Sequence, residues 1–414
     1  MKKKYLYALS VLTLLLSCNT HDKVDKFPSE DNYRSLTVAS LKGTATKYSQ
    51  FIDSIIYIPL ETPSNALLGG RIPKVIYTKS RYFIFDENKV VVFDSRGKYI
   101  FKVGKKGRGP REMITPSDFI VDTINNTIEV LSRIDGKILR YNLYNGQFIN
   151  AIRISGISAD KLCKADTDNY IIYGKGINSL EDKVRMVDNL FFYNKSNNSI
   201  IKTALAIPYY LTRFAGASDN SFSKVKEGIL FLRLLDNNIY LIDSSYQIHI
   251  KYKIDYGDHN MPTDENFFVK YKYLGSIIRN TEYAVHFTGL FASDSHLYFL
   301  FFVQNENYIV IYDRVHDIIL YGNQYKGIKN DIDLGPVMDA HGIFDNCLLS
   351  TIEPVYFISH FKKIRKELGE EQWNKYLLNH PDIKKILYKL EPENNPIIGL
   401  YYLRNSFRYE NNKN

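Results

Sequence analysis

Short apolar runs alternate with turn residues along most of the chain, and the runs recur in groups of four. The clearest group is Lys74–Tyr77, Tyr82–Asp86, Lys89–Asp94 and Gly97–Phe101. The next group is Phe119–Val121, Thr127–Leu131, Ile138–Asn142 and Gln147–Ile149. Four short strands per unit, separated by turn residues, is the pattern of a β-propeller blade.

The end of the third run in each unit marks the repeat. There an aromatic or aliphatic residue is followed by Asp or Asn, at Phe93-Asp94, Tyr141-Asn142, Tyr193-Asn194, Ile242-Asp243 and Tyr312-Asp313. The first four marks lie about 50 residues apart, near the length of known propeller repeats. The last gap is longer, and a helical pattern over Asp264–Asn280 accounts for the excess. We interpret each Asp or Asn as a turn residue that accepts hydrogen bonds from nearby backbone.

These marks define five units, and a sixth is expected from Val337 onwards. It contains the runs Ala340–Phe344, Cys347–Ile352 and Ile397–Leu403, interrupted by a charged amphipathic segment, Phe361–Leu390, that favours helix. We place the early strand Ile55–Leu60 in this last unit, because strands from both termini would then protect its free edges. The prediction is an all-β, six-bladed β-propeller of four-stranded antiparallel blades, with helical insertions in blades five and six.

The first residues indicate export. Lys2, Lys3 and Lys4 precede an apolar stretch, Tyr5–Leu16, that is too short to span a bilayer and is typical of a secretory signal. It ends in Leu15-Leu16-Ser17-Cys18, which resembles the lipobox of bacterial lipoproteins, so that Cys18 would carry lipid and anchor the chain to the membrane. We therefore divide the chain into a signal peptide (1–17), a lipid anchor with a flexible tether (18–50) and a propeller (51–414). Asn19 is not the Asp that resembles an inner-membrane retention signal, which favours the outer membrane.

Three segments carry a family resemblance. They are Pro59-Leu60-Glu61-Thr62, the run from Phe93 through Val103-Gly104-Lys105-Lys106-Gly107-Arg108-Gly109-Pro110-Arg111-Glu112, and Glu393–Ile398. Together they resemble the bacterial six-bladed β-propeller lipoproteins that are distantly similar to NHL-repeat proteins. The resemblance implies the fold and export, and an accessory role in glycan or nutrient uptake. The family usually has Gly at Arg111 and an aromatic residue at Met113, so loop contacts made by these two positions are not carried over.

The net charge of the chain limits the kinds of partner that it is expected to bind. The formal net charge is +9 and falls to +6 without the three N-terminal lysines, with no run of five like charges. An anchored exported protein with this mild excess is not expected to bind nucleic acid, whereas an acidic glycan is compatible with it. Cys163 and Cys347 both lie in apolar runs. They are expected to be buried free thiols, or alternatively to form a disulfide, which an oxidising compartment would permit.

A ligand face is expected at the mouth of the central channel. The glycine-rich segment Gly104–Gly109 leads into Pro110 rather than a helix, which argues against a phosphate loop. As a crossing between two blades it would place Arg108, Arg111 and Glu112 near the mouth, joined there by Arg133 and Arg213, and Arg can hold a carboxylate or sulfate bidentately. Alternatively, Glu112 and one Arg simply lock neighbouring loops.

The sequence contains no catalytic signature such as Gly-x-Ser-x-Gly or His-Glu-x-x-His. His286 and His341 fall at or just before inner strands, so a divalent metal in the channel, with Asp339 or Asp118 as a further ligand, is one hypothesis. The leading interpretation is a non-enzymatic lipoprotein on the outer membrane, acting as a ligand-binding protein or as a scaffold for an envelope protein. The alternative is a metal-dependent lyase or hydrolase with its site in the channel.

Overall fold

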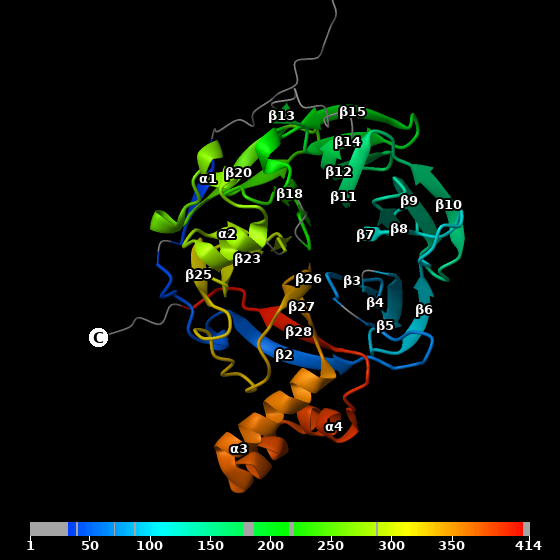
Figure 1. The fold of residues 1–414 in the computed structure, drawn as a ribbon. Coiled ribbons are helices and arrows are strands. Elements are labelled where there is room, and N and C mark those ends of the chain that lie inside the picture. Colours follow the sequence, from blue (N-terminus) through cyan, green and yellow to red (C-terminus); the bar gives the residue numbers. More distant parts are fainter. Residues whose placement is uncertain are drawn as a thin grey trace, which may run out of the picture.

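The computed structural model describes residues 32–38, 40–69, 71–86, 88–176, 186–214, 219–286 and 289–408. The expected signal peptide and Cys18 lie outside these residues. Within them the fold is mostly β and propeller-like, with six multistranded sheets arranged around a common centre (Figure 1).

Four sheets follow one another along the chain, each beginning with its innermost strand. The first contains β3 (Lys74–Thr78), β4 (Arg81–Phe85), β5 (Val90–Asp94) and β6 (Tyr99–Val103). The second contains β7 (Pro116–Asp122), β8 (Thr127–Ser132), β9 (Lys137–Asn142) and β10 (Phe148–Arg153). The third contains β11 (Ile157–Lys164), β12 (Asn169–Gly176), β14 (Leu190–Asn194) and β15 (Ser199–Ala204). The fourth contains β17 (Phe222–Val225), β18 (Gly228–Leu232), β19 (Asn238–Ile242) and β20 (Ile248–Asp255).

The last two sheets are less regular. In the fifth, both β21 (Val285–His286) and β22 (Phe291–Ala292) pair with β23 (His296–Val303), which is followed by β24 (Glu306–Asp313) and β25 (Ile318–Asn323). The sixth contains β26 (Ala340–Phe344), β27 (Cys347–Ile352), β28 (Ile397–Leu403) and the early strand β2 (Ile52–Pro59). A small separate pair is formed by β13 (Met186–Val187) and β16 (Ile207–Pro208).

The middle strands are buried on both faces because each sheet is stacked between two others. β5 is buried from Val90 to Phe93, and every residue of β8 is buried. The outer strand β10 is largely exposed because it lies at the rim. The turn after each third strand forms as expected: the Asp94 carboxylate accepts from the backbone N–H of Arg96 at 2.8 Å and of Lys98 at 2.9 Å.

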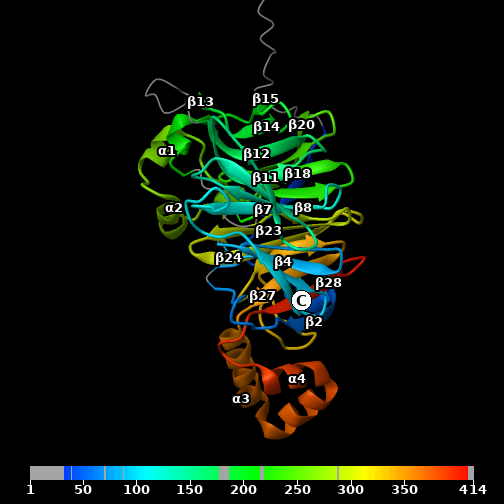
Figure 2. The ribbon, with the colours of Figure 1, turned by 90° about the vertical axis from the view of Figure 1, so that its right-hand side faces the viewer.

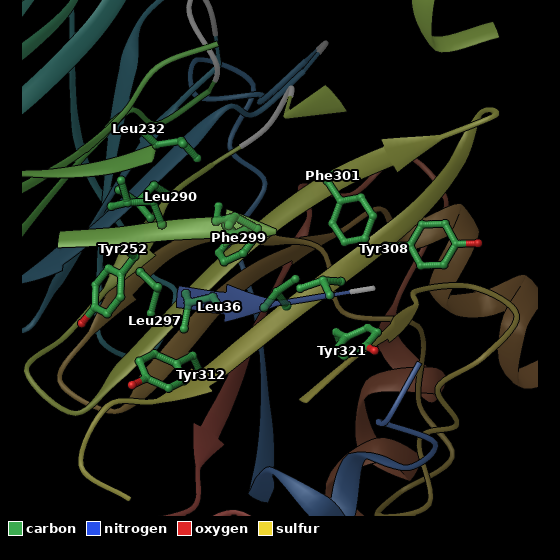
Figure 3. Packing of buried hydrophobic residues seen from close by; sticks show 14 of the residues in the cluster. Leu36, Leu232, Tyr252, Leu290, Leu297, Phe299, Phe301, Tyr308, Tyr312 and Tyr321 are labelled. Carbon is green, nitrogen blue, oxygen red and sulfur yellow. The ribbon is translucent and has the colours of Figure 1, made fainter. Parts of the chain in front are cut away.

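Residues from the N-terminal part of the chain complete two sheets. β2 pairs antiparallel with β28, with Ile55 opposite Tyr401, so strands from both ends of the chain share the sixth sheet as the sequence predicted. β1 (Arg34–Thr37) pairs in parallel with β20, and Leu36 packs beside Tyr252, Leu297 and Tyr312 (Figure 3). This pairing corrects the predicted tether of residues 18–50, since its last part belongs to the folded domain.

Helices occupy two connections. α1 (Glu265–Val269) and α2 (Leu274–Asn280) lie between β20 and β21. α3 (Pro354–Asn379), which is broken at Gly369, and α4 (Pro381–Lys389) lie between β27 and β28. α3 and α4 form an appendage that extends from the rim beside β2 (Figures 1 and 2). Short 3-10 turns occur at Tyr48–Gln50, Tyr209–Leu211 and Gly257–His259. No helix in the described ranges is both long enough and apolar enough to cross a bilayer.

Candidate functional site

A central cavity of about 270 Å³ is lined by residues from all six sheets. The strands that contribute are β3, β7, β11, β17, β22 and β26. Of these, β3, β7, β11 and β26 are labelled near the centre of Figure 1. The charged or titratable lining residues are Lys74, Cys163, Lys164, Lys224 and His341, and the remaining walls are mostly apolar. Within the part of the chain that the structure describes, no Asp or Glu lines this cavity.

Residues at or just before the lining stretches of the inner strands meet at one mouth of the cavity. Lys74 of β3 pairs with Asp118 of β7 at 2.9 Å between Nζ and Oδ1. The other oxygen of Asp118 accepts from the backbone N–H of Leu162 in β11 at 2.9 Å. Asp118 is only 2% exposed, so this one carboxylate fixes three adjacent sheets relative to one another.

Lys161 is the most unusual charge at this mouth. It is 7% exposed, and its Nζ donates to the carbonyl of Ser117 at 3.2 Å. Burial lowers the pKa of its ammonium group, with Asp118 acting in the opposite direction. None of the ion pairs in the described residues includes Lys161, so this buried cation has capacity to bind an anion.

Asp219, just before β17, is a largely buried acidic residue near Lys161. It pairs with Arg71 at 2.5 Å, and its side chain is 17% exposed. Burial raises the pKa of its carboxyl, while Arg71, Lys161 and His341 act to lower it. Residues that start four different sheets therefore interact electrostatically at this mouth.

His341 contributes from the sixth sheet. Its Nδ1 accepts from the backbone N–H of Thr351 at 3.2 Å, which leaves Nε2 as the protonated nitrogen of the neutral ring. That Nε2 lies 3.9 Å from a carboxylate oxygen of Asp339. His341 therefore presents a donor toward the acidic side of the mouth.

Lys164 of β11 and Lys224 of β17 bring further positive charge to the wall of the cavity. Lys164 pairs with Asp122 at 2.8 Å. Burial alone would raise the pKa of Asp122, but its hydrogen bond to Lys164 contributes to a net lowering of that pKa. Lys224 is exposed and close enough to Cys163 to act on its thiol electrostatically. Both cysteines are buried free thiols, which corrects the alternative of a disulfide between Cys163 and Cys347.

The predicted ligand residues separate in space. Arg133 lies nearest the mouth, paired with Asp160 of β11 at 2.9 Å. Glu112 binds its own loop: it pairs with Lys105 at 2.7 Å and accepts from the N–H of Gly109 at 2.9 Å. This differs from the alternative in which Glu112 and an arginine lock neighbouring loops, because Glu112 pairs with a lysine of its own loop.

The other three arginines point to different surroundings. Arg108 is exposed in the same loop as Glu112. The guanidinium of Arg111 lies 5.4 Å from the ring centre of Phe148, on the rim strand β10. Arg213 donates to the carbonyl of Phe268 in α1 at 2.7 Å, which ties the helical insertion to the ring.

The two histidines of the metal hypothesis are not brought together. His286 is 3% exposed, and its Nε2 lies 2.8 Å from the hydroxyl of Tyr256, with Phe299 packed beside it. Burial lowers the pKa of His286 to about 4. It is not among the residues that line the cavity, whereas His341 is. The described residues contain no group of three His, Cys, Asp or Glu side chains placed to hold a metal.

Sequence reasoning missed Lys74, Lys161, Asp219 and Lys224. The available signal was lysine within otherwise buried inner strands, as in Lys161-Leu162-Cys163-Lys164, where charge is costly unless it has a partner or a function. The apolar character of that run was recognised, but its two lysines were not interpreted.

Comparisons with solved structures place the fold. Over 90% of this chain and 100% of the other, it is similar to a protein from Bacteroides fragilis that is described as exported, with 17% identity and a TM-score of 0.70. A member of the DUF4221 family from Bacteroides vulgatus matches over 85% of this chain and 97% of that one, with 8% identity and a TM-score of 0.48. BamB from Moraxella catarrhalis matches over 67% and 69%, with 11% identity and a TM-score of 0.35.

No curated protein matches the sequence. A family model described as a domain of unknown function, DUF4934, matches residues 35–402. This range begins within β1 and ends within β28, so it covers nearly all of the six sheets and the whole helical appendage. The chain therefore belongs to the DUF4934 family.

Proposed function

We propose that this protein is an outer-membrane lipoprotein, built as a six-bladed propeller and anchored by lipid on Cys18, that binds a small acidic solute in its central channel. The observation that carries the proposal is the charge of the cavity. Its lining includes Lys74, Lys164, Lys224 and His341 but no described carboxylate. A cavity with apolar walls and a few placed polar groups is the usual form of a small-molecule site.

The carboxylates near the cavity form ion pairs with two of the lysines and not with two others. Asp118 and Asp122 neutralise Lys74 and Lys164 at 2.9 and 2.8 Å. Lys161 at the mouth and Lys224 on the wall are in no described ion pair, so they are the cations available to an incoming anion. An anion that reaches Lys161 would compensate a buried charge, and charged hydrogen bonds of this kind contribute about 1.5–3 kcal/mol each.

Cavity size favours a ligand of about one sugar ring. The volume of about 270 Å³ is just below the range of about 300–1,000 Å³ typical of pockets for drug-sized molecules. A uronic acid combines this size with a carboxylate for lysine and hydroxyls for the polar mouth. This chemistry agrees with the acidic glycan expected from the mild positive charge.

Export is supported independently of the site. The N-terminal sequence predicts a signal peptide followed by Cys18. The similar protein from Bacteroides fragilis is also described as exported. An anchored binding protein at the outer membrane could hold solute for an uptake system, or act as a scaffold for an envelope partner.

The test is calorimetric titration and thermal unfolding of the mature protein in detergent with glucuronate and galacturonate, against glucose and galactose. The uronates should bind and raise stability, by about 2.7 kcal/mol at a hundred times Kd, and the neutral sugars should not. Lys224→Met should weaken uronate binding about tenfold or more. Lys226→Met is the matched control, because Lys226 is exposed two residues later and does not line the cavity.

Each outcome is informative. If neither uronate binds, or if Lys226→Met weakens binding as much as Lys224→Met, the channel assignment is wrong. A loss of stability with EDTA in the absence of sugar would instead favour the channel-metal hypothesis.

A further inference from the structure

A second cavity, of about 540 Å³, lies between β2 and α4 at the rim. We define it as the rim cleft. Residues Ile55, Ile56, Tyr57 and Pro59 line one side, and residues 379–390 contribute His380, Pro381, Asp382, Ile383, Lys385, Ile386, Lys389 and Leu390 on the other. It is remote in sequence and fold from the central channel, which the inner strands line.

The rim cleft runs along the edge of β2. Successive residues of a strand point to opposite faces of its sheet. Ile55, Tyr57 and Pro59 lie on one face of β2 and Ile56 lies on the other, so the cavity follows one face of the strand and also reaches its backbone edge. Among the described strands, β2 pairs with β28 alone and is the last strand of its sheet. Ile56 is 47% exposed at this edge.

Unpaired strand edges are usually covered, because their free N–H and C=O groups recruit other chains. Here α4 stands beside the edge but leaves the rim cleft between them. The appendage is fixed in this position by its own core, in which Phe357, Trp373 and Tyr376 are buried and Tyr57 of β2 takes part. Tyr376 also donates from its hydroxyl to the carbonyl of Asp333 at 2.5 Å. The gap is therefore held open by a packed element.

The charged residues that line the rim cleft indicate which kind of peptide segment it could bind. Lys385 and Lys389 are exposed side chains of α4 that line the cleft, together with His380. Two acidic residues also line the cleft: Asp333 is 7% exposed, and burial raises the pKa of its carboxyl, whereas Asp382 is exposed in the first turn of α4. Lys385, Lys389 and His380 outnumber this one exposed carboxylate, so the accessible cleft has an excess of basic groups along α4 and is apolar along β2.

We infer that the rim cleft binds an extended acidic segment of a partner protein, which adds as a strand to the free edge of β2. Main-chain hydrogen bonds would supply affinity, and alternating side chains specificity. The lining stretch Ile55 to Pro59 spans four steps of about 3.3 Å, enough for roughly five residues of added strand. Alternating apolar and acidic residues would place carboxylates on one face of that strand.

The experiment is hydrogen exchange on the full mature protein with and without a capped seven-residue peptide of alternating glutamate and valine. Strand addition should slow amide exchange within residues 52–59, because their free N–H groups become bonded. The same peptide with proline at its centre, and a lysine-valine peptide, should give no protection. Lys385→Glu together with Lys389→Glu should weaken peptide binding about tenfold, as expected for reversing two exposed charges.

Lys362→Glu with Lys366→Glu is the matched control, because both lysines are exposed on α3 of the same appendage and neither lines the cleft. The inference is overturned if residues 52–59 gain no protection, if the lysine-valine peptide protects them equally, or if both double variants weaken binding alike. Protection of α4 without β2 would indicate surface attraction or a small amphiphile and would also overturn it. Uronate binding in the channel should be unchanged in both variants, so the two proposals fail separately.

Discussion

Asp118→Ala is the perturbation that most directly tests how the inner strands are held together. The carboxylate accepts from Lys74 at 2.9 Å and from the N–H of Leu162 at 2.9 Å. Its removal leaves Lys74, which is 12% exposed at its side chain, without its partner. Breaking a buried ion pair costs about 3–5 kcal/mol. Since Lys74 retains some access to water, we expect a loss of about 2–4 kcal/mol.

The assay is urea unfolding followed by far-ultraviolet circular dichroism. Fluorescence is less suitable because the single tryptophan, Trp373, belongs to the core of the appendage. Adding Lys74→Met to Asp118→Ala should restore part of the lost stability, because it removes the uncompensated charge. Glu370→Ala is the control: it breaks an exposed pair with Arg365 and should change stability little.

Two results would refute this reasoning. One is a loss below about 1 kcal/mol for Asp118→Ala, which would mean that water replaces the carboxylate without penalty. The other is a double variant less stable than Asp118→Ala alone, which would mean that Lys74 contributes mainly through packing.

Three further predictions follow from burial and charge. Leu36→Ala should cost about 2–4 kcal/mol in urea unfolding, because Leu36 is 2% exposed in the core, whereas a flexible tether would show no loss. Uronate affinity measured by calorimetry should rise as pH falls from about 8 to about 5. Because the pKa of Asp219 is raised and that of Lys161 is lowered, a fall in pH protonates both groups, which removes a negative charge and adds a positive one. Affinity that rises with pH would contradict the site. Cys347 should react with a thiol reagent only after unfolding, since it is buried and burial raises its pKa to about 12, and rapid native reaction would contradict its placement.

The regular strands were predictable because their signals are local. The Asp or Asn after each third strand binds backbone within four residues of itself, as Asp94 and Asp243 do, so the sequence alone marks these turns. β1 was missed for the opposite reason. Its four residues, Arg34–Thr37, show no period of their own, and their strand geometry depends on pairing with β20, more than 200 residues later.

The site was less predictable because, for a strand that is buried on both sides, hydrophobic periodicity does not show which side chains face the cavity. Lys161 sits in β11, where nearly every residue is buried, and only the stacking of neighbouring sheets directs it to the mouth. The predicted arginines were chosen for being in loops. Loop position does not fix side-chain direction, and Arg111 turns toward Phe148 at the rim.

The order of strands in the sixth sheet has a consequence for how the chain matures. β28 lies between β27 and β2, so the strand that pairs with β2 is synthesised after all the other strands that the structure describes. A chain that stops before Ile397 leaves β2 and β27 without a shared neighbour and exposes both edges. Strand-exposing fragments are prone to aggregation and degradation. A stable molecule therefore requires synthesis to continue through β28, and copies truncated before this strand would be removed before they could accumulate.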